Sequence, residues 1–238
     1  MADADSGAVV VVGGTRGLGL EVARAYARLG HEVVLTGRDP GQAAAVAKDL
    51  ADLDGPVTGL GLDLTFPEQI PERLAGVGPV RYLVLAAIDR DENTVRSYDI
   101  ARAMKLITMK LAGSTEVIHT LLERMPDDGA VLLFGGQAKH RPYPGSLTVT
   151  TVNGGVEAMV RTLAIELAPI RCNALHPGIV GDSPQWSDKA VALERTRERT
   201  PGGRLVTMDD IVHAAMFLLE NGAANGVNLS IDGGIMLT

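Results

Sequence analysis

The stretch Val9-Val10-Val11-Val12-Gly13-Gly14-Thr15-Arg16-Gly17-Leu18-Gly19 decides the fold. Its consecutive valines predict a strand that is buried on both faces, because β-branched side chains suit a pleated surface and offer no polar side to solvent. The glycines allow a tight turn and a close approach to the backbone, and a helical pattern begins at Gly17. Free N–H groups at the start of such a helix favour a phosphate. The stretch therefore predicts a dinucleotide site, with contacts from Gly13, Thr15, Arg16, Gly17, Leu18 and Gly19.

Short apolar runs alternate with helical patterns along the rest of the chain. Strands are expected at residues 9–12, 32–36, 57–62, 82–87, 130–134, 170–175 and 227–231. Helices are expected at residues 17–29, 42–53, 68–74, 98–125, 149–167 and 209–219. Near-continuous apolar strands joined by helices indicate a parallel sheet that is covered on both faces. The prediction is one α/β domain over residues 1–238, a doubly wound parallel sheet of the Rossmann type.

The composition excludes several classes of protein. With 238 residues, 46% of them hydrophobic, the chain is neither disordered nor fibrous. Acidic residues outnumber basic ones by 29 to 22, which argues against a nucleic-acid partner. The sequence holds no apolar run long enough for a membrane span. Cys172 is the single cysteine and is expected to be buried, and the acidic residues 1–6 do not resemble a signal peptide, so a cytoplasmic protein is expected.

The end of the second expected strand bears on the choice of cofactor. An acidic residue there would bind a free ribose 2′-hydroxyl, but Thr36 and Gly37 are neutral and Arg38 follows. Arg38, together with Arg16 in the glycine turn, favours the 2′-phosphate of NADP(H) over NAD(H). Asp39 could weaken this interpretation by pairing with Arg38.

The third expected strand is followed by Asp63 and Leu64. The carboxylate of Asp63 could accept a hydrogen bond from the adenine amino group, with the backbone of Leu64 beside it. Alternatively, Asp63 only caps the next turn.

These motifs resemble those of the short-chain dehydrogenase/reductase family over nearly the whole chain. The glycine turn is similar to the family's T-G-x-x-x-G-x-G, and Asp63-Leu64 is similar to its adenine-side aspartate. The segment 171–178 (RCNALHPG) resembles a family segment that ends a strand and lies against the nicotinamide, and residues 231–234 (IDGG) resemble its C-terminal motif. The resemblance implies hydride transfer between a nicotinamide cofactor and a carbonyl or alcohol. It adds Ala86, Ala87, Pro177, Gly178 and Ile179 to the expected cofactor contacts.

The family's catalytic residues do not align with matching residues here. Its members carry Y-x-x-x-K on a long helix, but Val149 and Asn153 stand at those positions. Gly136 or Gln137 stands where the family has a serine, and Lys110 replaces an asparagine on the preceding helix. Lys110 and Asn153 therefore suggest an exchange of lysine and asparagine between two facing helices, with Asn153 accepting a hydrogen bond from the Lys110 ammonium. A solvated Lys110 is the alternative.

No residue at the expected position replaces the tyrosine. Tyr143 and His140, in the loop after the fifth strand, are candidate proton donors, although loop packing and a solvated patch explain them equally well. Residues 182–204, which include Trp186, lie where the family places a substrate lid.

Two functions fit this pattern. The first is an NADP(H)-dependent oxidoreductase of short-chain dehydrogenase/reductase type, acting on a carbonyl or alcohol with a rearranged proton-donor site. The second is a non-catalytic NADP-binding protein, either a redox sensor or an inactive subunit. In either case the resemblance implies a homotetramer, or at least a dimer, that pairs the two long helices around Lys110 and Val156.

Overall fold

Residues 7–89 and 91–238 are described by a computed structural model. The acidic segment 1–6, which contributed to the expectation about targeting, lies outside the described residues. Within them, all strands belong to one parallel sheet in the order β3-β2-β1-β4-β5-β6-β7. The strands are β1 (Ala8–Val12), β2 (Val33–Gly37), β3 (Val57–Gly61), β4 (Val80–Leu85), β5 (Ala130–Phe134), β6 (Arg171–Pro177) and β7 (Asn228–Ile231). The predicted fold class, a single α/β domain of the Rossmann type, is confirmed.

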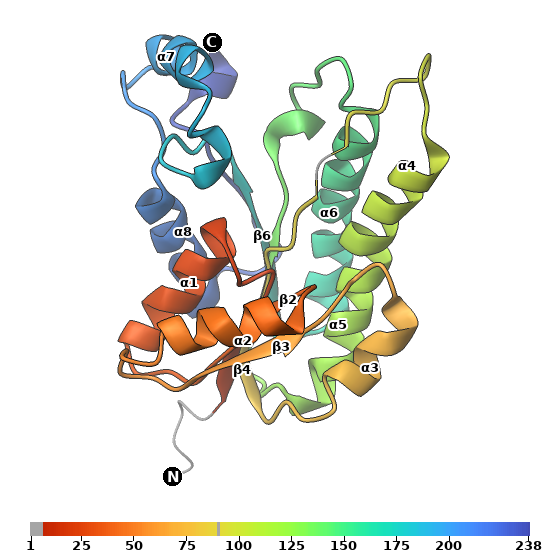
Figure 1. Cartoon of the computed structure of the whole chain (residues 1–238), viewed down its shortest axis with the longest axis vertical. Coiled ribbons are helices and arrows are strands. Elements are labelled where there is room, and N and C mark those ends of the chain that lie inside the picture. Colours follow the sequence, from red (N-terminus) through yellow and green to blue (C-terminus); the bar gives the residue numbers. More distant parts are fainter. Residues whose placement is uncertain (1–6, 90) are drawn as a thin grey trace.

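Helices cover both faces of this sheet. The α-helices are α1 (Gly17–Arg28), α2 (Pro40–Asp49), α3 (Ile70–Arg73), α4 (Ile100–Ile107), α5 (Ser114–Leu121), α6 (Leu147–Glu166), α7 (Ala190–Arg199) and α8 (Met208–Glu220). Figure 1 shows this sheet between α1, α2 and α8 on one side and α3 to α6 on the other. A π-helix, η2 (Thr108–Gly113), joins α4 to α5. The short 3₁₀ turns are η1 (Pro67–Gln69), η3 (Leu122–Arg124), η4 (Gln137–Lys139), η5 (Pro184–Trp186) and η6 (Ile235–Leu237). No helix among the described residues is long and apolar enough to cross a membrane.

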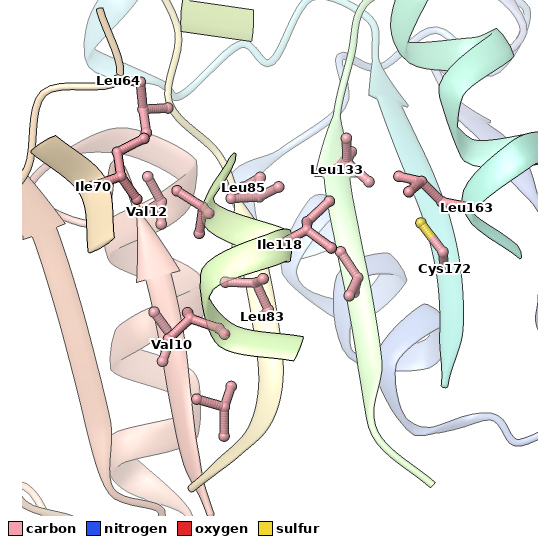
Figure 2. Packing of buried hydrophobic residues seen from close by; sticks show 14 of the residues in the cluster. Val10, Val12, Leu64, Ile70, Leu83, Leu85, Ile118, Leu133, Leu163 and Cys172 are labelled. Carbon is pink, nitrogen blue, oxygen red and sulfur yellow. The ribbon is translucent and has the colours of Figure 1, made fainter. Parts of the chain in front are cut away.

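The valines of β1 divide between two hydrophobic clusters, one on each face of the sheet. Val10 and Val12 lie in the cluster beneath α3, α4, α5 and α6, while Val9 and Val11 lie in the cluster beneath α1, α2 and α8. Figure 2 shows part of the first cluster, including Val10, Val12 and Cys172. Cys172 is fully buried and unpaired, as expected, and burial raises the pKa of its thiol to about 12. This double coverage explains why the strands carry apolar residues at successive positions rather than alternate ones.

Two features of the helices differ from the predictions. The single helix expected over residues 98–125 is interrupted by η2, because the π-turn inserts an extra residue and shifts side chains around the helix axis. Gly113, at its end, lies so close to the chain after β3 that a Cβ there would be 2.3 Å from the Leu64 carbonyl oxygen. The helix α7 falls inside the segment 182–204, for which no helix was predicted. Its sequence is strongly polar and gives little apolar periodicity.

Candidate active site

The glycine turn lies between the ends of β2 and β4, at the carboxyl edge of the sheet. The N–H groups of Gly13 and Gly14 both donate to the Thr36 carbonyl, at 3.1 and 2.9 Å. Gly13 has a φ of +82°, and a Cβ there would lie 2.6 Å from the Ala87 backbone. The turn therefore requires glycine at this position for both conformation and space.

The start of α1 leaves backbone donors free for a ligand. Arg16 precedes the helix in an extended conformation, and no side chain caps the first turn. Gly17 has a φ of +57°, and a Cβ there would meet no atom within 4 Å, so open space lies beside its backbone. Gly19 is packed against Gly13, since a Cβ would lie 2.3 Å from the Gly13 carbonyl oxygen. The half-buried Thr15 and Leu18 and the exposed Arg16 border this opening. Uncapped N–H groups beside open space can bind a pyrophosphate.

Arg38 does not pair with Asp39. The Asp39 carboxylate caps α2 by accepting from the Gln42 N–H at 2.8 Å. The Arg38 guanidinium instead lies 3.8 Å from Asp89 Oδ2, and Lys105 Nζ lies 3.1 Å from the same oxygen. The alternative in which Asp39 engages Arg38 is therefore wrong, because the cap holds Asp39 on its own helix. Sequence reasoning missed Asp89 and Lys105, which carry no local signal for this contact.

Asp63 caps the turn that follows β3. Its Oδ1 accepts from the Thr65 N–H at 2.9 Å and from the Thr65 hydroxyl at 2.8 Å. One of the two carboxylate oxygens of Asp63 therefore caps the turn, as the alternative interpretation expected. An adenine contact through the other oxygen stays a prediction, as does the backbone contact of the buried Leu64.

Lys110 lies inside the protein, and the residue is only 6% exposed. Its ammonium donates to the Phe134 carbonyl at 2.6 Å and to the Ala87 carbonyl at 3.2 Å. These carbonyls stand just at or beyond the carboxyl ends of β5 and β4, so the ammonium bridges the two strands where the nicotinamide half of a dinucleotide is expected. Burial lowers the pKa of Lys110 to about 8. A lysine with this pKa can exchange a proton near neutral pH.

The expected hydrogen bond between Lys110 and Asn153 is not formed. The ammonium donates to carbonyls instead, and the Asn153 side chain makes no hydrogen bond within the described parts of the chain. Asn153 is buried on α6 and faces Gly136, where a Cβ would lie 3.1 Å from Asn153 Nδ2. Lys110 contacts these carbonyls rather than Asn153 because peptide carbonyls at the strand ends would otherwise be buried acceptors without a donor. Val149, one turn earlier on α6, is half-buried and packs against apolar neighbours.

Tyr143 and His140 form no hydrogen bond or ion pair with Lys110 or Asn153 in the described residues. Tyr143 is 55% exposed and lines a depression of about 450 Å³ between residues 93–96 and residues 142–151. His140 lies 3.8 Å from Glu157, which also pairs with Lys139 at 2.6 Å. Both residues thus have no hydrogen bond or ion pair with the buried lysine, and their roles as proton donors stay predictions.

The end of β6 brings Pro177, Gly178 and Ile179 to the same edge of the sheet. The Gly178 N–H donates to the Ile231 carbonyl at 2.9 Å. A Cβ at Gly178 would lie 2.8 Å from Asp232 Cβ, so the segments 171–178 and 231–234 are in contact here. Ala86, which follows β4, lies at this edge too, and its N–H donates to the Val12 carbonyl at 2.9 Å.

His176 is a further buried polar residue beside this edge, and sequence reasoning did not single it out. Asn228 donates through Nδ2 to the Glu157 carbonyl, so its Oδ1 accepts from His176 Nε2 at 2.9 Å. The other ring nitrogen, Nδ1, then has no hydrogen left to donate, and it has no partner in the described residues. Burial lowers the pKa of His176 to about 4, so the ring is neutral at physiological pH.

The segment 182–204 folds as η5 and α7 beside the end of β6. The Asp182 carboxylate accepts from the Met208 N–H at 2.8 Å, which ties the segment to the start of α8. Lys189 Nζ lies 5.0 Å from the ring centroid of Trp186. Closure of this segment over a substrate stays a prediction.

Known proteins are similar to this chain over most of its length. The family described as "Enoyl-(Acyl carrier protein) reductase" matches residues 12–236. The short-chain dehydrogenase/reductase malC of Malbranchea aurantiaca is 27% identical over 96% of this chain and 94% of its own. A 3-oxoacyl-[acyl-carrier-protein] reductase of Bos taurus is 30% identical over 96% of this chain and 97% of its own. The chain belongs to the short-chain dehydrogenase/reductase family.

A solved structure supports the fold of this short-chain dehydrogenase/reductase. The MalC Reductase/Diels-Alderase from Malbranchea aurantiaca superposes with a TM-score of 0.89 at 24% identity, covering 98% of both chains. Short-chain dehydrogenases/reductases are oxidoreductases that bind nicotinamide cofactors, act on small molecules and typically form oligomers. That Val149, Asn153 and either Gly136 or Gln137 stand at the family's catalytic positions stays a prediction from the sequence.

Proposed function

We propose that the protein is an NADP(H)-dependent oxidoreductase that acts on a carbonyl or alcohol and uses Lys110 in place of the family's tyrosine and lysine. The observation that carries this proposal is the buried Lys110 ammonium, held by the Phe134 and Ala87 carbonyls. A lysine buried only for packing would be costly, since desolvation disfavours its charge. Its position at the ends of β4 and β5 gives that cost a functional explanation.

The residues present fit a dinucleotide. Gly13 and Gly19 close the turn tightly, whereas Gly17 faces open space beside the uncapped start of α1. Gly13, Thr15, Arg16, Gly17, Leu18 and Gly19 would hold the pyrophosphate side, and Ala86, Ala87, Pro177, Gly178 and Ile179 would border the nicotinamide side. Asp63 and Leu64 would border the adenine. When bound, NADPH supplies the hydride for the reduction of a carbonyl carbon.

The preference for NADP(H) rests on charge. Arg16 is exposed at the glycine turn, and Arg38 follows β2, whose last residues Thr36 and Gly37 are neutral. Guanidinium groups bind phosphates through paired donors, and β2 itself ends without the acidic side chain that would favour a free ribose 2′-hydroxyl.

Lys110 would supply the proton that the carbonyl oxygen needs. At neutral pH most Lys110 is protonated, because its pKa is about 8. Two of its N–H groups are directed to carbonyls, which leaves the third for a substrate oxygen or an intervening water. The neutral amine formed by donation would then regain a proton from solvent. Asn153, which faces Gly136, would orient the substrate near the position where the family's serine is expected.

The test measures NADPH oxidation with a panel of aldehydes and ketones. Lys110→Met should lower kcat by about 10²–10⁴-fold, the usual contribution of a positioned acid, while NADPH affinity changes little. The wild-type kcat for reduction should also fall as pH rises through about 8, where Lys110 loses its proton. Lys48→Met removes an exposed lysine on α2 and should match the wild type. An unchanged kcat in Lys110→Met would contradict the role of Lys110.

A non-catalytic NADP-binding protein is the second candidate. What favours it is the predicted alignment, in which Val149 stands at the family's tyrosine and Gly136 or Gln137 at its serine, so that neither position offers a hydroxyl group to a substrate. This candidate predicts tight NADPH binding without oxidation of NADPH by any carbonyl of the panel, in the wild type and Lys110→Met alike. If the protein is instead the oxidoreductase proposed above, the segment 182–204 would close over its substrate.

A further inference from the structure

Three charged side chains from distant parts of the chain meet above the glycine turn. Arg38 follows β2, Asp89 follows β4, and Lys105 lies on α4. Both cations are drawn to one oxygen: Asp89 Oδ2 lies 3.8 Å from Arg38 Nη1 and 3.1 Å from Lys105 Nζ. Phosphate oxygens in protein sites are also contacted by Arg and Lys side chains, so this carboxylate oxygen has the same kind of neighbours as a bound phosphate oxygen.

The position of this cluster follows from the sheet order. Strand β1 separates β2 from β4, and the glycine turn leaves the end of β1. On one side the turn touches β2, since a Cβ at Gly37 would lie 2.6 Å from Thr15 Cγ2. On the other side it touches the chain after β4, since a Cβ at Gly13 would lie 2.6 Å from Ala87. The pair between Arg38 and Asp89 therefore crosses over the turn, where the adenosine half of a dinucleotide is expected.

We infer that Asp89 holds Arg38 and Lys105 as an internal substitute for the 2′-phosphate of NADP(H), and that Lys105 is a specificity-determining residue which binds this phosphate once Asp89 has moved aside. The inference rests on the proposed preference for NADP(H) and adds a residue on α4 to it. In the protein without cofactor, the carboxylate keeps the two cations positioned. In the complex, the 2′-phosphate, which carries more negative charge than a carboxylate, takes over both of them.

The exposure of the three side chains makes this exchange inexpensive. The side chains of Arg38, Asp89 and Lys105 are 55%, 33% and 47% exposed. Ion pairs this exposed contribute little to stability, so a dianion can compete with the carboxylate for the two cations. The displaced carboxylate nevertheless stays near the phosphate and opposes its binding. Asp89 should therefore lower the affinity for NADP(H) and leave that for NAD(H) nearly unchanged.

The experiment compares affinities for NADPH and NADH by calorimetry on the wild type, Asp89→Asn and Lys105→Met. Asp89→Asn should tighten NADPH binding about fivefold, and Lys105→Met should weaken it by a similar factor, with NADH shifted much less. The fragments adenosine 2′,5′-bisphosphate and adenosine 5′-monophosphate should reproduce the difference, because they isolate the 2′-phosphate from the nicotinamide. Asp49→Asn and Lys48→Met change the same charges on the exposed face of α2 and should have no effect.

The outcomes separate this inference from the proposed cofactor preference. If the wild type prefers NADPH and neither variant changes the ratio of the two affinities, the inference is wrong and the preference stands. If the wild type binds both cofactors equally and Asp89→Asn creates a preference for NADPH, the proposed preference is wrong and the blocking role of Asp89 stands. If no variant discriminates between the two cofactors, both are overturned.

Discussion

At the scale of single residues, His176 links the stability of the protein to pH. Its pKa is lowered to about 4 by burial, against about 6.5 for an ordinary histidine. Between these two values the unfolded chain binds more protons than the folded one, so the free energy of unfolding decreases as pH falls through this window. The contribution of this one group is ~1.4 kcal/mol per pH unit.

The prediction is that His176→Gln loses less stability on acidification than the wild type does. Urea unfolding near pH 7 and near pH 5 should show a difference of about 2 kcal/mol between the two proteins in the acid-induced loss. His119→Gln, at an exposed position on α5, is the matched control and should lose as much stability as the wild type. Equal losses in all three proteins would mean that His176 titrates normally in the folded state.

At the scale of elements, the strand–turn–helix unit from β1 to α1 contains a glycine whose substitution should weaken NADPH binding without preventing folding. Gly17→Ala places a methyl group in the open space beside the start of α1, where a phosphate would lie. The left-handed φ of +57° costs about 1–2 kcal/mol of stability with alanine, so the variant should still fold. Its NADPH affinity should fall at least tenfold, because the backbone can no longer be approached closely.

A control with the same strain is available at the other end of the same helix. Gly30, just after α1, has a φ of +86°, and a Cβ there would meet no atom within 4 Å. Gly30→Ala should lose similar stability without any change in NADPH affinity, as measured by thermal unfolding and calorimetry. If Gly17→Ala binds NADPH as tightly as Gly30→Ala does, the pyrophosphate does not lie at this turn.

At the scale of the whole molecule, we expect a homotetramer, or at least a dimer. Lys110 and Val156, which marked the two helices in the sequence, face the protein interior, but other residues of these helices are exposed and apolar. Ile100 and Met104 on α4 are 60% and 51% exposed. Leu147, the first residue of α6, is exposed as well. Because α4 packs against α6, an isologous contact over both helices would bury these side chains.

Light scattering tests this assembly. Met104→Glu should shift the protein toward a smaller species at micromolar concentration, since a carboxylate would be buried without a partner. Val191→Glu introduces the same charge at an exposed apolar position on α7 and should leave the assembly intact. A wild type that is monomeric at micromolar concentration would refute the expectation.

The sequence was most informative where a local pattern determines the structure. The valine run and the glycines predicted β1, the turn and α1, because burial on both faces and positive φ values restrict which residues can occupy those positions. The pattern could not predict the partners of Lys110, which are carbonyls at the ends of strands far away in the chain. The same holds for the meeting of Arg38 with Asp89 and Lys105, and for the π-turn that interrupts the expected long helix. Such contacts depend on tertiary packing and leave no periodic signal.

The pairing of β1 with β4 also affects how the protein folds. Val12 lies beside Leu85 in the sheet, so a long loop must close before the central strands can pair. The first strand, helix and second strand can form a local unit, but the turn at Gly13 lacks its packing against Ala87 until β4 has joined the sheet. The Lys110 ammonium in turn requires the Phe134 carbonyl at the end of β5. During synthesis, a chain shorter than this has the glycine motif without the contacts that hold Lys110, and the candidate active site is complete only after β5 has joined the sheet.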